Sequence, residues 1–360
     1  MKLLITGICG FVGSTVALAL RESQPDWEIG GLDSLVRRGS QLNVERLTAR
    51  GIAVRHGDLR NRSDLQALPA ADWIIDCAAN PSVLAGIDGK SSSRQLIEHN
   101  LVGTIELLEL AKQWNAGFIM LSTSRVYSIA ALAGLPMLPA SSTAARADAF
   151  TLDPAGNLPP GVGPAGVGET FSTTAPISLY GSSKLASEAL ALEYGSAFGF
   201  PVYVNRCGVL AGAGQFGKID QGIFSYWLHA YAARRKLKYI GFGGTGRQVR
   251  DCLHAADLTP LLLKQIAAGQ REHRLCNLSG GAAQSLSLAQ LTAWCEQRFG
   301  RHEIERDPTP RPFDIPWLIL DSARARTEWD WRPQISIEAI LNEIADHAES
   351  HPEWLRMCED

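Results

Sequence analysis

The sequence predicts an α/β fold in which helices cover both faces of a doubly wound parallel sheet. In the first half of the chain, apolar runs of strand length alternate with helix-like stretches. KLLITG precedes GSTVALALRES, and ADWIIDCAA precedes QLIEHNLVGTIELLELAKQW and GFIMLSTS. The apolar runs are continuous rather than alternating, as expected for strands that are buried on both faces. A helix after each strand provides the crossover that parallel strands need.

The pattern changes twice along the chain. Residues 129–168 are rich in Ala, Gly and Pro and have no sustained period, which is typical of a variable surface loop or a partly ordered lid. Beyond residue 200 strands and helices are mixed, with GFPVYVNRCGVL as a strand and GIFSYWLHAYAARR as a helix. We expect residues 1–200 to form the first domain and 201–360 mainly a smaller C-terminal α/β substrate lobe, with 250–275 returning to the first domain.

Composition excludes several kinds of partner. The 360 residues carry a net charge of −3 and are 46% hydrophobic, which gives no sign of a nucleic-acid or membrane partner. The first residues, MKLLITG, resemble a strand more than a signal peptide. Seven Cys without a C-x-x-C pair indicate free thiols in a cytoplasmic protein, and the eight His show no metal-ligand spacing, so no metal is expected.

A glycine-rich turn follows the first strand. Gly7-Ile8-Cys9-Gly10-Phe11-Val12-Gly13 leads directly into an apolar helix, and its backbone N–H groups can approach a pyrophosphate. Asp33 ends the second strand about 20 residues later, where a carboxylate binds ribose hydroxyls and repels a 2′-phosphate. These features predict a Rossmann fold with NAD rather than NADP. Arg37, near the end of the second strand, could contact either a 2′-phosphate or the adenine edge. Asp58 is either an adenine contact or a strand-end cap.

Tyr180 and Lys184 provide the first catalytic signal. Residues four apart on a helix share one face, so the Lys184 ammonium can lower the pKa of Tyr180 and make it a general base toward an alcohol. On its own the spacing also fits an ordinary surface pair. Thr123, a hydroxyl at the end of the strand GFIMLST, favours the catalytic interpretation.

The motifs TGICGFVG, CAAN, HNLVGT, STSRVY, YGSSK and RQVRDCLHAAD together resemble the extended short-chain dehydrogenase/reductase family that acts on nucleotide sugars. LVRRGSQLN and GQFGKIDQGIFSYW are most similar to the CDP-paratose/CDP-tyvelose 2-epimerases within it. The resemblance implies a homodimer with a Thr123, Tyr180 and Lys184 triad. It places on the cofactor side Gly7, Cys9, Gly10, Phe11, Val12, Gly13, Asp33, Ser34, Arg37, Asp58, Leu59, Ala78, Ala79, Asn100, Tyr180 and Lys184.

The resemblance also implies a set of substrate contacts, with Arg250 expected at the diphosphate. These contacts are Ser124, Arg125, Arg206, Gln215 and Arg250. The alternative for Gln215 is that its loop only packs against the small lobe. The alternative for Arg250 is a structural ion pair with Asp251 or Asp257. The chain departs from the family at Val209 and Ala211, where Asn and Tyr are usual, so the sugar pocket is expected to differ.

The two residues after Thr123 limit which reactions of the family this chain is expected to catalyse. Family members that dehydrate nucleotide sugars follow this Thr with Asp-Glu, whereas this chain has Ser124 and Arg125 and no acid. We therefore expect a nucleotide-sugar epimerase that oxidises and re-reduces a sugar carbinol with bound NAD, at C2 of a CDP-hexose. A 4-epimerase and a net dehydrogenase or reductase on a related substrate are the alternatives. Decarboxylation of a uronic acid and a non-catalytic NAD-binding protein are less favoured.

Overall fold

The central sheet has seven parallel strands in the order β12-β8-β5-β4-β1-β2-β3. It is seen in a computed structural model that describes residues 1–87, 89, 92–138, 148–218 and 221–358. The sheet confirms the predicted doubly wound fold. Its strands are β1 (Lys2–Thr6), β2 (Glu28–Asp33), β3 (Ala53–His56), β4 (Trp73–Asp76), β5 (Gly117–Thr123), β8 (Val202–Cys207) and β12 (Leu275–Leu278).

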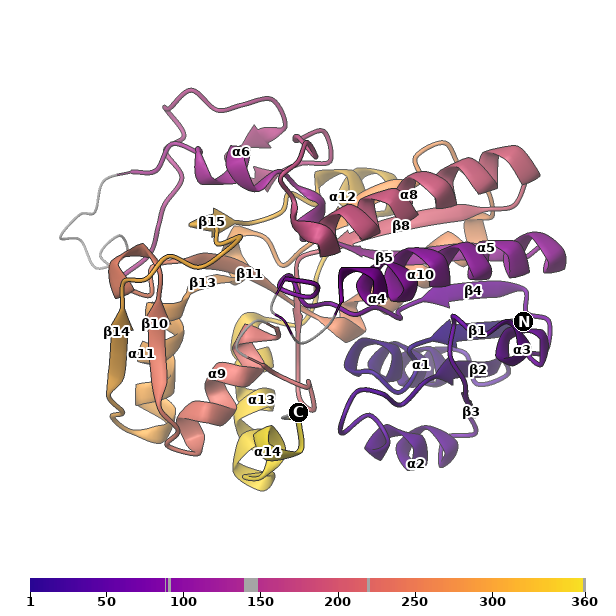
Figure 1. The fold of residues 1–360 in the computed structure, drawn as a ribbon, viewed down its shortest axis with the longest axis horizontal. Coiled ribbons are helices and arrows are strands. Elements are labelled where there is room, and N and C mark those ends of the chain that lie inside the picture. The colour runs from indigo at the N-terminus through magenta and orange to yellow at the C-terminus, as the bar shows by residue number, and fades with distance from the viewer. Residues whose placement is uncertain (88, 90–91, 139–147, 219–220, 359–360) are drawn as a thin grey trace.

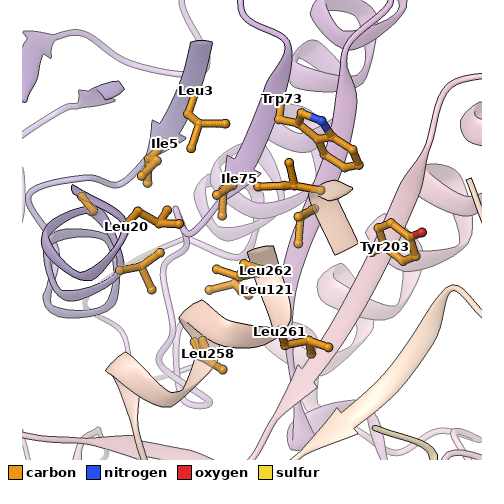
Figure 2. Packing of buried hydrophobic residues seen from close by; sticks show 14 of the residues in the cluster. Leu3, Ile5, Leu20, Trp73, Ile75, Leu121, Tyr203, Leu258, Leu261 and Leu262 are labelled. Carbon is orange, nitrogen blue, oxygen red and sulfur yellow. The ribbon is translucent and has the colours of Figure 1, made fainter. Parts of the chain in front are cut away.

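Helices cover both faces of this sheet (Figure 1). The first face packs against α1 (Phe11–Ser23), α10 (Leu258–Ala268) and α12 (Ala323–Trp329). Figure 2 shows Leu20 of α1 and Leu258, Leu261 and Leu262 of α10 against strand side chains on this face. The second face carries α3 (Arg62–Gln66), α5 (Gly103–Trp114) and α8 (Ser178–Phe198). Short helices α2 (Leu42–Thr48) and α4 (Ser93–Ile97) lie in the connections.

The smaller lobe contains two further sheets. One joins β9 (Val209–Ala211), β11 (Val249–His254), β13 (Ser285–Ser287) and β15 (Trp317–Leu318), and the other pairs β10 (Leu237–Ile240) with β14 (Ile304–Asp307). A core of its own forms between α9 (Ile223–Ala232), α11 (Leu288–Phe299), α13 (Ile337–Ser350) and α14 (Trp354–Cys358). Single-turn segments are η3 (Phe242–Gly244), η4 (Ala255–Asp257) and η5 (Ala282–Gln284).

The main sheet extends beyond residue 200, where the sequence placed the start of the smaller lobe. Strands β8 and β12 both belong to it, because each continues the parallel ladder after β5. Within the range 250–275, α10 packs on the main sheet, whereas β11 pairs with β9, β13 and β15 of the smaller lobe. The chain thus crosses between the two parts several times.

The described part of the 129–168 segment is packed against the smaller lobe. It contains α6 (Ile129–Ala133) and a short hairpin of β6 (Val162–Gly163) and β7 (Gly166–Val167), and residues 139–147 lie outside the described part of the chain. Leu132, Leu152 and Val167 are buried in one cluster with Val249 and Trp317. These residues form core structure, whereas the lid role stays a prediction.

Neither a membrane span nor a metal cluster is found within the described ranges. No helix there is long and apolar enough to cross a bilayer. Likewise, these residues contain no group of three or more His, Cys, Asp or Glu side chains arranged to hold a metal ion.

Candidate active site

The glycine-rich turn leaves no room for side chains. Gly7 has a φ of 60°, and a Cβ there would lie 2.9 Å from the Cα of Ala78, at the end of β4. A Cβ on Gly13 would lie 2.2 Å from the Gly7 carbonyl oxygen. The turn therefore brings the start of α1 against the ends of β1 and β4, which is the geometry that a pyrophosphate-binding helix N-terminus requires.

Asp33 and Asn43 hold this turn from two sides. The Asp33 carboxylate accepts hydrogen bonds from the N–H groups of Cys9 (2.9 Å) and Leu35 (2.8 Å) at the end of β2. The Asn43 amide donates to the carbonyl of Cys9 at 2.9 Å. Burial, with a smaller effect of the nearby Asp33 charge, raises the pKa of the Cys9 thiol to about 12, so this thiol is protonated at neutral pH. Its role is packing in the turn.

The segment after Asp33 contacts a loop of the smaller lobe. Arg37 donates a 2.5 Å hydrogen bond to the carbonyl of Phe216, and its guanidinium lies 6.0 Å from the centre of the Phe216 ring. Gly39 has a φ of 89°, and a Cβ there would lie 2.8 Å from the same ring. Trp354 stacks on Phe216 from α14 with ring centres 5.5 Å apart. The two segments most similar to the 2-epimerases thus touch each other beside the Asp33 end of β2.

The other residues expected near the cofactor fall into two structural settings. The guanidinium of Arg60 lies 2.6 Å from the carboxylate of Asp58 and lowers the pKa of that carboxyl, and the adenine contact stays a prediction. Asn100 lies in a π-helical turn, η1 (Glu98–Val102), and links the two halves of the site. Its side chain exchanges hydrogen bonds with the backbone of Asn80 (2.7 and 3.1 Å) and donates to the Ser183 hydroxyl (3.2 Å) on α8.

The three predicted catalytic residues come together where β5 meets α8. Thr123 ends β5, and its hydroxyl lies within hydrogen-bonding reach of the Tyr180 phenol. Tyr180 and Lys184 are both buried, one turn apart on α8. Gly181 lets this helix approach, since a Cβ there would lie 2.3 Å from the carbonyl oxygen of Arg125.

The electrostatics around Tyr180 differ from the expected arrangement. Burial raises the pKa of its phenol to about 12, and the two groups that oppose this rise are the Thr123 hydroxyl and the Arg125 charge. Lys184 lies instead close to the thiols of Cys77 and Cys207, where its charge counteracts part of the burial effect on their pKa values. The cation that acts on Tyr180 in this structure is therefore Arg125.

Arg206 was expected at the substrate, but the structure gives it a different partner. Its guanidinium makes three contacts of 2.6 to 3.1 Å with the carboxylate of Glu188, and both side chains are buried. Ser122 donates to the same carboxylate at 2.5 Å. Because a buried guanidinium with a bidentate carboxylate is already satisfied, Arg206 is a structural residue that joins β8 and β5 to α8.

The remaining substrate candidates lie at the junction of the two parts. Arg250 donates to the carbonyls of Val249 (2.7 Å) and Ile315 (2.9 Å) and lies 3.6 Å from the carboxylate of Asp314. Gln215 donates to the Leu210 carbonyl at 2.7 Å. Ser124 is buried, and it begins the 3₁₀ turn η2 (Ser124–Val126), in which the N–H of Arg125 donates to the Thr123 hydroxyl.

Comparison with known proteins agrees with this geometry. The sequence model of the NAD dependent epimerase/dehydratase family matches residues 3–277. The chain belongs to this family. It is 29% identical to the CDP-paratose 2-epimerase of Salmonella typhi, over 97% of this chain and 100% of that protein, and 28% identical to a dTDP-glucose 4,6-dehydratase of Actinoplanes, over 98% and 100%. The crystal structure of a UDP-glucuronic acid 4-epimerase variant from Bacillus cereus, with NAD bound, superposes with a TM-score of 0.74 at 21% identity, over 97% and 99%.

NAD is the cofactor of this family, and the described residues fit it. The crowded glycines would hold the pyrophosphate with the N-terminus of α1, and Asp33 lies at the strand end where the ribose hydroxyls bind. Tyr180 and Lys184 lie on α8, which packs against β5, on the other side of β4 from β1 and the glycine-rich turn.

Several residues that contribute to the site were not predicted from the sequence. Glu188 had a usable signal, since it lies eight residues after Tyr180 and four after Lys184, on the same buried face of α8. Asn43 and Phe216 lie in LVRRGSQLN and GQFGKIDQGIFSYW, so the resemblance marked their segments but not their contacts. Asp314 had no signal, because it acts through a contact with a distant part of the chain. The departures Val209 and Ala211 pack into the apolar core of the smaller lobe.

Proposed function

We propose that this protein is a nucleotide-sugar epimerase that acts on C2 of a CDP-hexose. The observation that carries the proposal is the pair formed by Thr123 and Tyr180 with Arg125, not an acid, beside it. The full-length similarity to a CDP-paratose 2-epimerase supports the choice of C2 and of a cytidine nucleotide.

Tyr180, Thr123 and Lys184 have separate roles in the proposed reaction. Bound NAD, held by the glycine-rich turn and Asp33, would supply the hydride acceptor and donor for inversion at one carbon. Tyr180 takes the proton from the sugar hydroxyl as the carbon is oxidised and gives it back as the ketone is reduced. Thr123 donates a hydrogen bond to the reacting oxygen and holds it against Tyr180. Lys184, one turn after Tyr180 on α8, would bind the cofactor ribose and so position the nicotinamide beside the sugar.

Removal of water from the sugar needs a group that protonates the departing hydroxyl. The positions after Thr123 hold Ser124 and Arg125, and a guanidinium keeps its protons at all working pH values. We therefore favour epimerisation over dehydration, although a dTDP-glucose 4,6-dehydratase is among the relatives.

The proposal is tested by offering CDP-, UDP-, GDP- and dTDP-hexoses to the purified protein in D2O. We expect epimerisation of the CDP-hexose without deuterium at the reacting carbon and without net change in nicotinamide absorbance. Deuterium at that carbon would point to a carbanion and contradict hydride return. Steady accumulation of reduced cofactor would contradict the epimerase and favour a net dehydrogenase.

A second candidate is epimerisation at C4. Full-length relatives include a UDP-glucuronate 4-epimerase and a UDP-glucose 4-epimerase, at 23% and 26% identity. The same assay separates the two candidates, because NMR of the product identifies the inverted carbon. A homodimer in the cytoplasm completes the proposal, and sedimentation of the purified protein tests the dimer.

A further inference from the structure

Three arginines and two carboxylates meet next to the catalytic residues. Arg250 lies 3.6 Å from Asp314, and it is also close enough to Asp251, Arg125 and Arg311 for their charges to interact. Arg125 in turn interacts with the charges of Asp314 and Arg311. The side chains of Arg250 and Asp314 are mostly buried, with 14% and 18% exposed. A buried cluster in which three arginines face two carboxylates is suited to bind an anion.

Arg125 has an unused donor in this cluster. Its Nη1 atom is buried, and no described residue accepts a hydrogen bond from it. An unpaired buried guanidinium nitrogen is costly unless a ligand supplies the missing acceptor. Burial lowers the pKa of Arg125, and Asp314 and Tyr180 counteract this, which places the charge between the arginine cluster and the catalytic phenol.

The backbone fixes this position. The N–H of Arg125 donates to the Thr123 hydroxyl oxygen at 3.1 Å, and its carbonyl oxygen lies against Gly181, the residue after Tyr180. Arg125 therefore stays next to the reacting oxygen of any sugar that Thr123 and Tyr180 hold. The anion that it binds must lie close to the reacting carbon.

We propose that Arg125 pairs with the sugar-linked phosphate of the nucleotide sugar and thereby selects C2 as the reacting carbon. This inference rests on the proposed function. In a nucleotide sugar the diphosphate is attached to C1. C2 is bonded to C1, whereas C4 lies across the ring. An arginine that holds the phosphate beside Thr123 and Tyr180 therefore brings C2, not C4, to the catalytic pair.

Calorimetry with the NAD-loaded protein tests the phosphate contact without catalysis. The ligands are CDP and CMP, which differ in the outer phosphate, and the variants are Arg125→Gln and Arg125→Lys. We expect Arg125→Gln to weaken CDP binding about 10-fold or more while CMP binding changes little, because a charge-assisted hydrogen bond is lost. Arg125→Lys is expected to retain part of the preference for CDP. Arg332→Gln, at an exposed position, is the matched control and should bind both ligands as the unmodified protein does.

The possible results distinguish failure of the phosphate contact from failure of the proposed epimerase function. Unchanged CDP binding by Arg125→Gln, or an equal loss for CDP and CMP, would overturn the phosphate contact alone. If the unmodified protein binds none of CDP, UDP, GDP and dTDP, both the proposed function and the inference fail. Suppose that Arg125→Gln weakens CDP binding but that the unmodified protein inverts C4. This result would overturn the selection of C2. Thermal melting and retained NAD show whether each variant is folded.

Discussion

The buried ion pair between Arg206 and Glu188 gives a sharp prediction for Arg206→Met. Glu188 accepts four hydrogen-bond contacts in the structure, three from Arg206 and one from Ser122. The substitution removes three of them and leaves a carboxylate that is only 2% exposed with a single hydroxyl donor. Removal of one partner from a buried pair costs about 3–5 kcal/mol, so we expect a loss of this size in the free energy of unfolding.

The assay is urea-induced unfolding at neutral pH with NAD in constant excess. Glu188→Leu/Arg206→Met, which removes both charges, should recover most of the loss, since apolar replacements of a buried pair are often neutral or stabilising. Arg298→Met is the matched control, because Arg298 also contacts two carboxylates, Asp346 and Glu349, but its side chain is 34% exposed. Its substitution should cost much less free energy of unfolding than Arg206→Met, because water screens an exposed ion pair.

Activity provides a second, independent readout. The pair joins α8, which carries Tyr180 and Lys184, to the end of β5, which carries Thr123, because Ser122 and Arg206 are neighbours across β5 and β8. The stable double variant should therefore bind NAD but turn over slowly. A loss below about 1 kcal/mol in Arg206→Met, or a double variant no more stable than the single one, would refute the reasoning.

Three further predictions concern the base, the turn and acid stability. Tyr180→Phe keeps the buried ring but should lower kcat by about 10²–10⁴-fold with NAD still retained. Equal loss of NAD would contradict a purely chemical role. Gly13→Ala should yield protein without NAD, because the new Cβ would lie 2.2 Å from a carbonyl oxygen, whereas Gly163→Ala, with nothing within 4 Å, should retain it. His229 and His347, 2.9 Å apart, have pKa values lowered from 6.5 to about 4, mainly by burial. The unfolded chain therefore binds their protons first, and stability should fall as the pH drops from 6.5 to 4. His229→Gln should show a weaker fall between pH 7 and 5 in urea unfolding, and an unchanged slope would exclude this pair as the cause.

The parts of the fold that were predicted are those encoded in short continuous stretches. Five strands of the main sheet and the helices between them come from apolar runs, and the glycine-rich turn comes from a local spacing. The helical period placed Tyr180 and Lys184 on one face of α8, and the structure shows that this face is buried. In each case the physical cause acts within about 20 residues, so one sequence is enough to find it.

The missing parts depend on contacts between distant segments. Phe216 reaches Arg37 and Gly39 across 179 and 177 positions of the sequence, and no local pattern encodes that meeting. Arg206 was assigned to the substrate because its own segment resembles a family motif, while its partner Glu188 lies on another element. Similarly, the charge that acts on Tyr180 was expected from the nearest lysine on its helix, and the structure supplies it from Arg125 on η2.

The position of Arg125 links the kind of reaction to the choice of substrate. Neither the Ser124 hydroxyl nor the Arg125 guanidinium can replace the Asp-Glu pair that dehydration uses after this Thr. On our proposals, the positive charge of Arg125 would stabilise the Tyr180 phenolate that accepts the proton of the sugar hydroxyl, and it would also hold the phosphate next to C2. An acid at this position would repel that phosphate and weaken the oxyanion. A single substitution at position 125 would therefore alter both the chemistry available at the site and the carbon presented to it, which means that the two properties are constrained to change together.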